Sequence, residues 1–395
     1  MKADVIRAPG PDPRAQIVLT LRRRGVLSRA EIARATGLAK STVSEIVSEL
    51  LRSGIVVSSA TVRKPARNGR PGEGLTLNPS AGSYVGVDFG FRHVRSVVAD
   101  VSHRILATSE RRVGADYSLD EALSVAGELV AETVERSAVD RESVLGIGVA
   151  VPGPFDAAGG TVIGTSMVPT WSGANVRSVL TDLFAQEVIL DNDSNCGALA
   201  ELLWGAGAGS RSLAYIKLHS GVGGAVVVNG ELVHGVAGSA GEFGHITVDP
   251  NGLPCRCGGR GCLETYVGIP ALLDQLSPRL GSTPTLRRLL ELAEDGDLAC
   301  RRVLSDAADM AGRALGIVSN VLAPGLIVVG GALADAGPLL LDPLERSFRS
   351  HSIVTRSLAA TPPPIQVVPG SLGRNASALG AVALVLTRLG VEQIA

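Results

Sequence analysis

Aromatic residues and methionine are scarce in this sequence: Phe, Trp and Tyr make up 3% of 395 residues, and Met occurs 3 times. A hydrophobic core must therefore be built mainly from Ala, Val and Leu. No apolar run reaches the roughly 18 residues that would span a bilayer. The opening stretch, MKADVIRAPGPDPR, also lacks the apolar segment of a signal peptide. We therefore expect a cytoplasmic protein with no membrane partner.

The sequence also has no large excess of charge of either sign, because its formal net charge is −1. The charges are nevertheless segregated along the chain. Residues 1–80 hold 14 Lys and Arg and 6 Asp and Glu, a net charge of +8, whereas residues 81–395 hold 23 and 32, a net charge of −9. Because a basic segment attracts polyanions, this pattern predicts a small nucleic-acid-binding module on a more acidic body. A basic tail that only improves solubility is the alternative.

Cysteines are few, but three of the five lie together at Cys255, Cys257 and Cys262. In a cytosolic chain, clustered cysteines indicate a metal site rather than disulfides. Cys196 and Cys300 stand alone inside helical patterns, which is typical of ordinary buried residues.

The basic segment has the pattern of a helix-turn-helix. Residues 14–24 form an apolar helical stripe that ends in three arginines. A second helix follows Ser28, which has Glu31 at the spacing of a capping box. After a turn at Gly37, a third helix begins near Lys40 and repeats apolar residues at helical spacing. Such helix pairs also occur in proteins that never bind DNA.

The residues that follow favour DNA binding. Residues 54–57 and 75–77 read as paired strands around the basic loop VRKPARNGRPGEG, which is the pattern of a winged helix-turn-helix. The third helix would enter the major groove, and the wing would contact phosphates or the minor groove. The expected DNA-binding residues are Lys40, Ser41, Thr42, Ser44, Glu45, Arg67 and Arg70.

The rest of the chain alternates strands and helices and repeats one order of elements. Residues 84–90, 95–100 and 105–111 read as short strands joined by tight turns. A strand, a Gly-rich turn and a strand recur at 213–229, and a helix is expected from about 375 to 389. This repetition predicts an α/β body of two related lobes with a ligand cleft between them.

The cysteine cluster has a nearby histidine. His245, Cys255, Cys257 and Cys262 supply one imidazole and three thiolates, the donor set of a closed tetrahedral zinc site. We therefore expect a structural Zn²⁺. Free thiols beside an unrelated histidine are the alternative.

Carboxylates and amides gather around this cluster and after a buried strand. Glu242 and Glu264 flank the cysteines, and Asn192, Asp193 and Asn195 follow the strand ending in ILD. Such side chains suit a polyhydroxylated ligand, because each hydroxyl needs both a donor and an acceptor. A solvated surface is the alternative.

The run from Gly241 to Thr265 resembles a motif of the ROK proteins (repressor, open reading frame, kinase), E-x-G-H followed by C-x-C-G-x-x-G-C-x-E. The resemblance covers nearly the whole chain. It implies an actin-like, ribonuclease-H-like fold of two lobes, as in sugar kinases and in sugar-responsive regulators that carry an N-terminal winged helix.

The resemblance also implies roles and boundaries. The winged helix would occupy residues 1–80 and the kinase-like domain 81–395. Lobe one would cover about 81–186 plus the C-terminal helix, and lobe two about 187–373. Zinc would bind His245, Cys255, Cys257 and Cys262. The sugar would contact Asn192, Asp193, Glu242, His245 and Glu264. Asp193 falls where the kinases keep their catalytic base.

Two departures from the family pattern separate this chain from the kinases. The kinases have D-x-G-G-T at the first phosphate turn, where this chain has Asp88-Phe89-Gly90-Phe91-Arg92. Phe91 adds bulk where a backbone should approach phosphate, so the turn should disable phosphoryl transfer. A second departure is Met167, which stands where an asparagine commonly meets the sugar.

The sequence therefore predicts a DNA-binding transcriptional regulator, most simply a repressor, controlled by a sugar or sugar phosphate. Its partners would be a double-stranded DNA operator and further copies of itself, in a homodimer or homotetramer. No catalytic residue is expected. An ATP- and Mg²⁺-dependent sugar kinase with Asp193 as base is the alternative, and a sugar-binding scaffold for another protein is a third reading.

Overall fold

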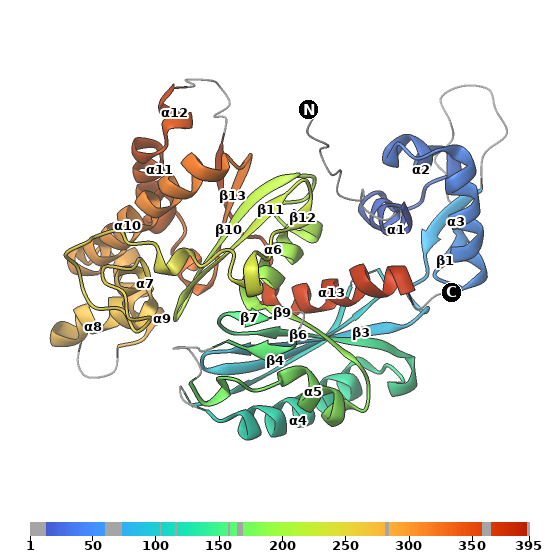
Figure 1. Cartoon of the computed structure of the whole chain (residues 1–395), viewed down its shortest axis with the longest axis horizontal. Coiled ribbons are helices and arrows are strands. Elements are labelled where there is room, and N and C mark those ends of the chain that lie inside the picture. Colours follow the sequence, from blue (N-terminus) through green and yellow to red (C-terminus); the bar gives the residue numbers. More distant parts are fainter. Residues whose placement is uncertain are drawn as a thin grey trace, which may run out of the picture.

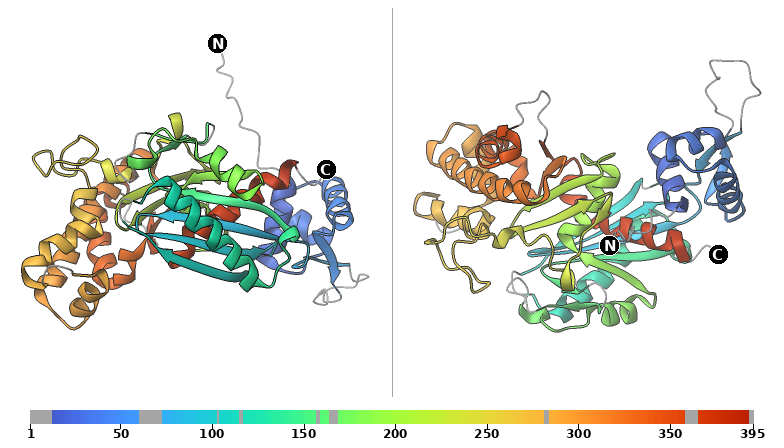
Figure 2. Two further views of the ribbon diagram at one scale, coloured as in Figure 1. Left: turned by 90° about the horizontal axis from the view of Figure 1, so that it is seen from below. Right: turned by 45° about the horizontal axis from the view of Figure 1, so that its top comes forward.

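The computed structural model shows a small N-terminal domain attached to a two-lobed α/β body (Figure 1). In all three views the N-terminal domain and the helices of the second lobe lie at opposite ends of the molecule (Figures 1 and 2). The structure describes residues 13–59, 73–102, 104–114, 117–156, 159–163, 169–280, 284–357 and 365–392.

The N-terminal domain is a winged helix, as the sequence predicts. Its elements are α1 (Pro13–Arg24), α2 (Arg29–Thr36), α3 (Lys40–Arg52), β1 (Val56–Ser59) and β2 (Gly74–Leu77). The Ser28 side chain caps α2, and the Glu31 carboxylate accepts a hydrogen bond from the Ser28 N–H at 2.8 Å, which completes the capping box. β1 and β2 pair antiparallel. The predicted wing residues Arg67 and Arg70 lie outside the described residues, as does Met167.

The first lobe is built on a five-stranded sheet in the order β5-β4-β3-β6-β9. Its strands are β3 (Ser83–Gly90), β4 (His93–Asp100), β5 (Ile105–Arg112), β6 (Val144–Val151) and β9 (Val188–Asn192). β3, β4 and β5 form an antiparallel meander, and β6 and β9 run parallel to β3. Helices α4 (Leu119–Ser137) and α5 (Val176–Phe184) cover one face, where Trp171 and Phe89 are fully buried.

The second lobe repeats this topology with the sheet order β12-β11-β10-β13-β14. Its strands are β10 (Ser212–Leu218), β11 (Val222–Val228), β12 (Glu231–Leu232), β13 (Leu326–Gly330) and β14 (Gln366–Pro369). Its helices are α7 (Glu264–Val267), α8 (Ile269–Leu280), α9 (Leu286–Glu294), α10 (Leu298–Leu322), α11 (Pro338–His351) and α12 (Ile353–Ser357). The shared strand order confirms the two related lobes that the repeated turns predict.

Helix α6 (Asp193–Trp204) lies between the two sheets. Cys196 and Leu199 pack against the first sheet, whereas Ala198 and Leu202 pack against the second. Every residue of α6 from Ser194 to Leu203 is buried, as expected of a helix enclosed between two layers. The predicted lobe boundaries stay a prediction. β9, assigned by them to lobe two, is hydrogen-bonded to β6 in the first sheet.

The C-terminal helix α13 (Ala376–Glu392) crosses the first sheet on the face opposite α4 and also packs on α6. The backbones come unusually close. A Cβ added at Gly148 would lie 1.8 Å from the Ala381 carbonyl oxygen, and one at Gly380 would lie 1.8 Å from the Cys196 carbonyl oxygen. α13 also contacts α1 of the winged helix, so this helix connects the body to the N-terminal domain.

No helix in the described part of the chain combines the length and the apolar composition needed to cross a membrane.

The packing of α13 predicts that Gly380→Ala destabilises the protein by about 3 kcal/mol, because the new methyl group overlaps a backbone oxygen that cannot move away alone. In an open helix the same change would stabilise by about 1 kcal/mol. Thermal unfolding of the full chain should show a Tm lower by roughly 5 °C or more.

Gly127→Ala in α4 is the matched control, because its Cβ would meet only Leu183 side-chain carbons, at 3.4 Å or more. An unchanged Tm for Gly380→Ala, or an equal loss in both variants, would contradict this account of the α6–α13 contact.

Candidate functional site

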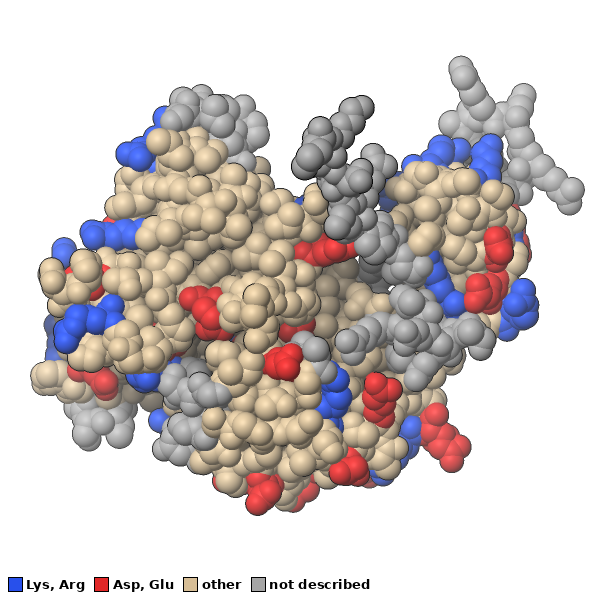
Figure 3. Space-filling view, in the orientation of Figure 1, with Lys and Arg blue, Asp and Glu red and all other residues tan. Residues whose placement is uncertain are grey.

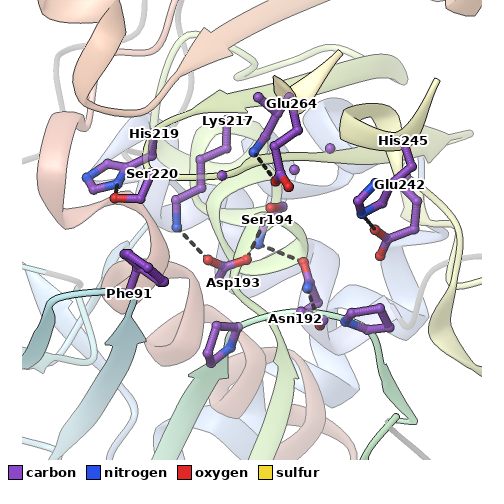
Figure 4. Close-up of a pocket in the computed structure, with 18 of the residues that line it drawn as sticks. Phe91, Asn192, Asp193, Ser194, Lys217, His219, Ser220, Glu242, His245 and Glu264 are labelled. Carbon is purple, nitrogen blue, oxygen red and sulfur yellow. Dashed lines mark hydrogen bonds and ion pairs between the residues drawn. The ribbon is translucent and has the colours of Figure 1, made fainter. Parts of the chain in front are cut away.

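A cavity of about 490 Å³ opens between the lobes, at the carboxyl ends of their strands. Its floor is the start of α6, and its walls are the turn after β3, the segment after β6, the turn between β10 and β11, and the loop before α7. The cavity contains every ligand-binding residue predicted from the sequence: Asn192, Asp193, Glu242, His245 and Glu264. Figure 4 shows these side chains converging from both lobes.

Asn192 holds the start of α6 in place. Its side-chain oxygen accepts hydrogen bonds from the N–H groups of Ser194 and Asn195, and its amide donates to the Gly153 carbonyl at 2.7 Å. This N-cap fixes the first turn of α6 against the segment after β6. Asn192 therefore lines the cavity and at the same time orients the residue that follows it.

That next residue, Asp193, forms an ion pair that the sequence reasoning missed. Its Oδ2 lies 2.7 Å from the Nζ of Lys217 (Figure 4). Lys217 also donates to the Ser377 hydroxyl at 3.1 Å. Burial alone would lower the pKa of Lys217, but the carboxylates of Asp193 and Asp88 raise it above its usual value. Lys217 therefore stays charged inside the cleft. The sequence held one sign of this ion pair, because Lys217 is the single charged residue of the apolar strand run LAYIKL.

The turn after β3, where the kinases of the family bind phosphate, is filled by the protein's own side chains. Asp88 is buried, and its Oδ2 accepts from His93 at 3.0 Å and from Arg95 at 3.4 Å. Burial opposes ionisation of Asp88, but the hydrogen bond from His93 and the charges of Lys217, His93 and Arg95 hold its pKa well below the usual range. Phe91 lines the cavity at the same turn. These contacts support the prediction that the turn has lost its phosphate chemistry.

The turn between β10 and β11 faces the turn after β3 across the cavity. The rings of His219 and His93 lie 6.2 Å apart between centroids. Burial, with the positive charges of Lys217 and His93, lowers the pKa of His219 to about 4, so this imidazole is neutral at pH 7. Two imidazoles and a phenyl ring thus occupy the ends of the turns where a nucleotide phosphate would need open backbone N–H groups.

The remaining two carboxylates differ in their surroundings. Glu264 accepts from the Val222 N–H at 3.0 Å and from the Arg256 Nε at 2.9 Å, so its charge is matched. Glu242 has a pKa raised to about 7, first by burial and then by the negative charges of Asp193 and Glu264. The cavity therefore offers acceptors at Asp193 and Glu264 and, near neutral pH, a carboxyl at Glu242 that is partly a donor.

The cysteine cluster lies beside the cavity. The candidate ligand atoms of His245, Cys255, Cys257 and Cys262 all lie within 4.8 Å of one another. The Sγ atoms of Cys257 and Cys262 are 3.7 Å apart, close to the edge of about 3.8 Å in a tetrahedron with metal–sulfur bonds of about 2.3 Å. The four residues predicted from the sequence thus form a group that can hold a metal ion.

His245 connects this cluster to the cavity. Its Nδ1 lies 3.7 Å from the Cys255 Sγ, and its Nε2 lies 3.9 Å from the Glu242 carboxylate. The loop closes at Gly261, which has a positive φ of 65° and sits where a Cβ would be 1.6 Å from the Asp249 carbonyl oxygen. A bound metal would fix His245, and through it the cavity wall that carries Glu242.

The predicted DNA-contacting residues of α3 are accessible. Lys40, Ser41, Ser44 and Glu45 are exposed, and Thr42 is half-buried. The opposite face, with Val43, Val47 and Leu50, is fully buried in the domain core. Lys and Arg side chains also gather on the face of the domain over α2 (Figure 3). The described part of the domain therefore presents α3 to a partner, as DNA binding requires.

Comparisons with known proteins agree with this arrangement. Residues 84–388 match the ROK family, and residues 14–57 match the winged helix-turn-helix DNA-binding family. The chain is 28% identical to the xylose repressor of Bacillus subtilis over 362 residues, which cover 91% of each protein.

Two solved structures are similar along much of their length. A ROK family transcriptional regulator, a homologue of the Escherichia coli Mlc protein, covers 97% of this chain and 99% of its own at 24% identity, with a TM-score of 0.77. The Streptomyces griseus ROK glucokinase, solved with glucose and AMPPNP, covers 76% of this chain and 98% of its own at 29% identity, with a TM-score of 0.69. The family match spans well over half of the sequence, and the chain belongs to the ROK family.

Proposed function

We propose that this protein is a sequence-specific DNA-binding repressor whose operator affinity is controlled by a sugar or sugar derivative in the cleft. The observation that carries the proposal is the combination of an accessible α3 with a polar cleft whose phosphate turn is filled by Phe91 and His93. Similarity to a xylose repressor over 91% of the chain supports it. A cavity of about 490 Å³ lined by carboxylates and amides suits a ligand rich in hydroxyl groups.

DNA binding would use both parts of the winged helix. Ser41 and Ser44 lie in the first half of α3, where recognition helices contact base edges, and Lys40 is placed for a phosphate or a base. Arg67 and Arg70 of the wing would contact phosphates, which adds affinity without sequence preference. Homodimers or homotetramers would bring two such domains to one operator.

The test is operator binding in the presence of sugars. The full-length protein should select a defined sequence from random duplex DNA and bind it with strong salt dependence. Anisotropy titrations with D-xylose, D-glucose, N-acetyl-D-glucosamine and their phosphates should find one sugar that weakens this binding about tenfold or more. Absence of any selected sequence would overturn the DNA model.

Variants assign this binding to the winged helix. Arg70→Ala should weaken binding to all sequences and lower the salt slope by about one. Ser44→Ala should instead change sequence preference. Arg302→Ala is the control, because Arg302 is an exposed arginine of α10 in the second lobe. Equal losses in all three variants would contradict the assignment.

We also propose that His245, Cys255, Cys257 and Cys262 bind a structural Zn²⁺. Three thiolates and one imidazole match the preferences of zinc, and four protein ligands leave no open coordination position. The bound ion would hold His245 and the loop before α7, and so orient Glu242 and Glu264 toward a ligand.

Removal of one cysteine should therefore abolish zinc binding. Cys262→Ala is expected to weaken zinc affinity at least the roughly 100-fold that even outer-shell changes can cost. Elemental analysis of the purified protein should show stoichiometric zinc in the wild type and almost none in the variant, with a lower Tm. Cys300→Ala, at a buried cysteine of α10, should keep its zinc. Full zinc content in Cys262→Ala would refute the site.

A sugar kinase is the second candidate function, because Asp193 and the glycine turn between β10 and β11 are present. The Asp88 Oδ1, buried and without a hydrogen-bond partner among the described residues, also leaves an acceptor open. Against it, Lys217 neutralises Asp193 at 2.7 Å, and a base held in an ion pair takes protons poorly. Phe91 stands at the first turn, so the residues present do not fit ATP with Mg²⁺.

Phosphoryl transfer should accordingly stay below about 10⁻³ s⁻¹, against roughly 1–100 s⁻¹ for kinases. A coupled assay of ADP release with MgATP and the same panel of sugars measures it. Asp193→Asn is the control for contaminating activity. Sugar-dependent turnover near 1 s⁻¹ or above that disappears in Asp193→Asn would establish the kinase instead.

A further inference from the structure

Lys217 links three separate elements at the floor of the cleft. It projects from β10, pairs with Asp193 at the start of α6, and donates to Ser377, the second residue of α13. Ser377 in turn donates to the Asp193 carbonyl at 3.0 Å. The three residues form a closed triangle of hydrogen bonds, which we call the Lys217 triangle. Charge-assisted hydrogen bonds away from bulk water are among the stronger polar contacts in a protein.

The far part of α13 leads to the DNA-binding domain. Its first turn lies in the Lys217 triangle, its middle is packed between the first sheet and α6, and α1 of the winged helix lies against it. Figure 1 shows α13 extending from beneath the cleft toward the winged helix.

The first two turns of α13, which include Ala378, Gly380 and Ala381, leave no room for motion independent of β3, β6 and α6. Added Cβ atoms at Gly86, Gly148 and Gly380 would lie 1.8–2.0 Å from carbonyl oxygens across the contact. Packed interfaces of this kind shift between discrete arrangements instead of deforming gradually. A displacement of the first turn of α13 would therefore be passed along the helix to α1.

Asp193 is also a proposed ligand contact, so a ligand and Lys217 would meet at the same carboxylate. A sugar hydroxyl can donate a hydrogen bond to Asp193 Oδ2 while its oxygen accepts one from Lys217 Nζ. Insertion of that hydroxyl separates the ion pair and draws the ammonium away from Ser377. The Lys217 triangle then opens without any change in the number of charged groups in the cleft.

We propose that Lys217 is the positioning residue that couples the cleft to the DNA-binding domain. With the cleft empty it holds Asp193 and Ser377 together and fixes the first turn of α13. A ligand hydroxyl that enters between Lys217 and Asp193 breaks that link, so the turn shifts together with the elements packed against it, and α13 transmits the change to α1. This inference rests on the proposed function, and it identifies the residues through which the ligand would control operator binding.

Hydrogen–deuterium exchange of the full-length protein tests the coupling without ligand or DNA. In Lys217→Met, amides of the first turn of α13 and of α1 should exchange about tenfold faster than in the wild type, because exchange reports local opening. Ser377→Ala keeps the ion pair and removes only the link to α13, so it should produce the same change in α1. The double variant should add little more.

Arg279→Met is the matched control. It breaks the ion pair between Arg279 of α8 and Asp297, the N-cap of α10. Both helices belong to the second lobe, at the end of the molecule opposite the winged helix (Figures 1 and 2). Its α13 and α1 amides should exchange as in the wild type. Faster exchange confined to β10 and α6 in Lys217→Met, with α13 and α1 unchanged, would overturn the proposal. If Lys217→Met does not fold, Ser377→Ala decides the question alone by the same criterion.

Measurements of operator binding distinguish a failure of the coupling from a failure of the proposed repressor function. Both Lys217→Met and Ser377→Ala should bind the selected DNA about tenfold more weakly, a loss typical of allosteric coupling, and should respond less to the effective sugar. If the wild type selects no DNA, the proposed function fails, whereas the exchange measurement still judges the coupling. Wild-type DNA affinity in both variants, with unchanged exchange in α1, would overturn the coupling and leave the repressor intact.

Discussion

The close contact of α13 with the first sheet and α6 is the constraint on which the rest of this structure depends. At Gly86, Gly148 and Gly380, backbone atoms come so near that no side chain fits between them. This contact fixes α6 between the two sheets, and the start of α6 forms the floor of the cleft. It also carries α1, so the position of the winged helix relative to the cleft depends on the same helix.

The cleft keeps the polar groups of a sugar site but satisfies many of them internally. Asp88 is matched by His93 and Arg95, and Asp193 by Lys217, so neither carboxylate is an isolated charge. At Asp193, a ligand must therefore replace a contact that the protein already makes with Lys217. That exchange makes a ligand effective at changing conformation, because its binding free energy differs between the two arrangements. A catalytic site requires the opposite, a base that is free when the substrate arrives.

The parts predictable from the sequence are those defined by short stretches of chain. The capping box at Ser28 and Glu31 and the metal group from His245 to Cys262 each lie within one local segment, and the structure places their members together. The Lys217 triangle was not predictable in this way. Lys217 lies 24 residues from Asp193 and 160 from Ser377, and only the register of β10 against its neighbours brings them together. Likewise, β9 looked like the start of the second lobe, but its hydrogen bonds to β6 place it in the first sheet.

The length of helix α13 amplifies small movements at its cleft end. It has 17 residues, which at about 1.5 Å per residue make a rod of roughly 25 Å. A tilt of about 10° about its cleft end would move its far end by about 4 Å. Successive base pairs along one DNA strand are spaced by about 3.4 Å, so this small tilt would shift a winged helix by about one base pair. Because the spacing of operator half-sites is fixed, a shift of that size along the DNA axis would move the base contacts out of register.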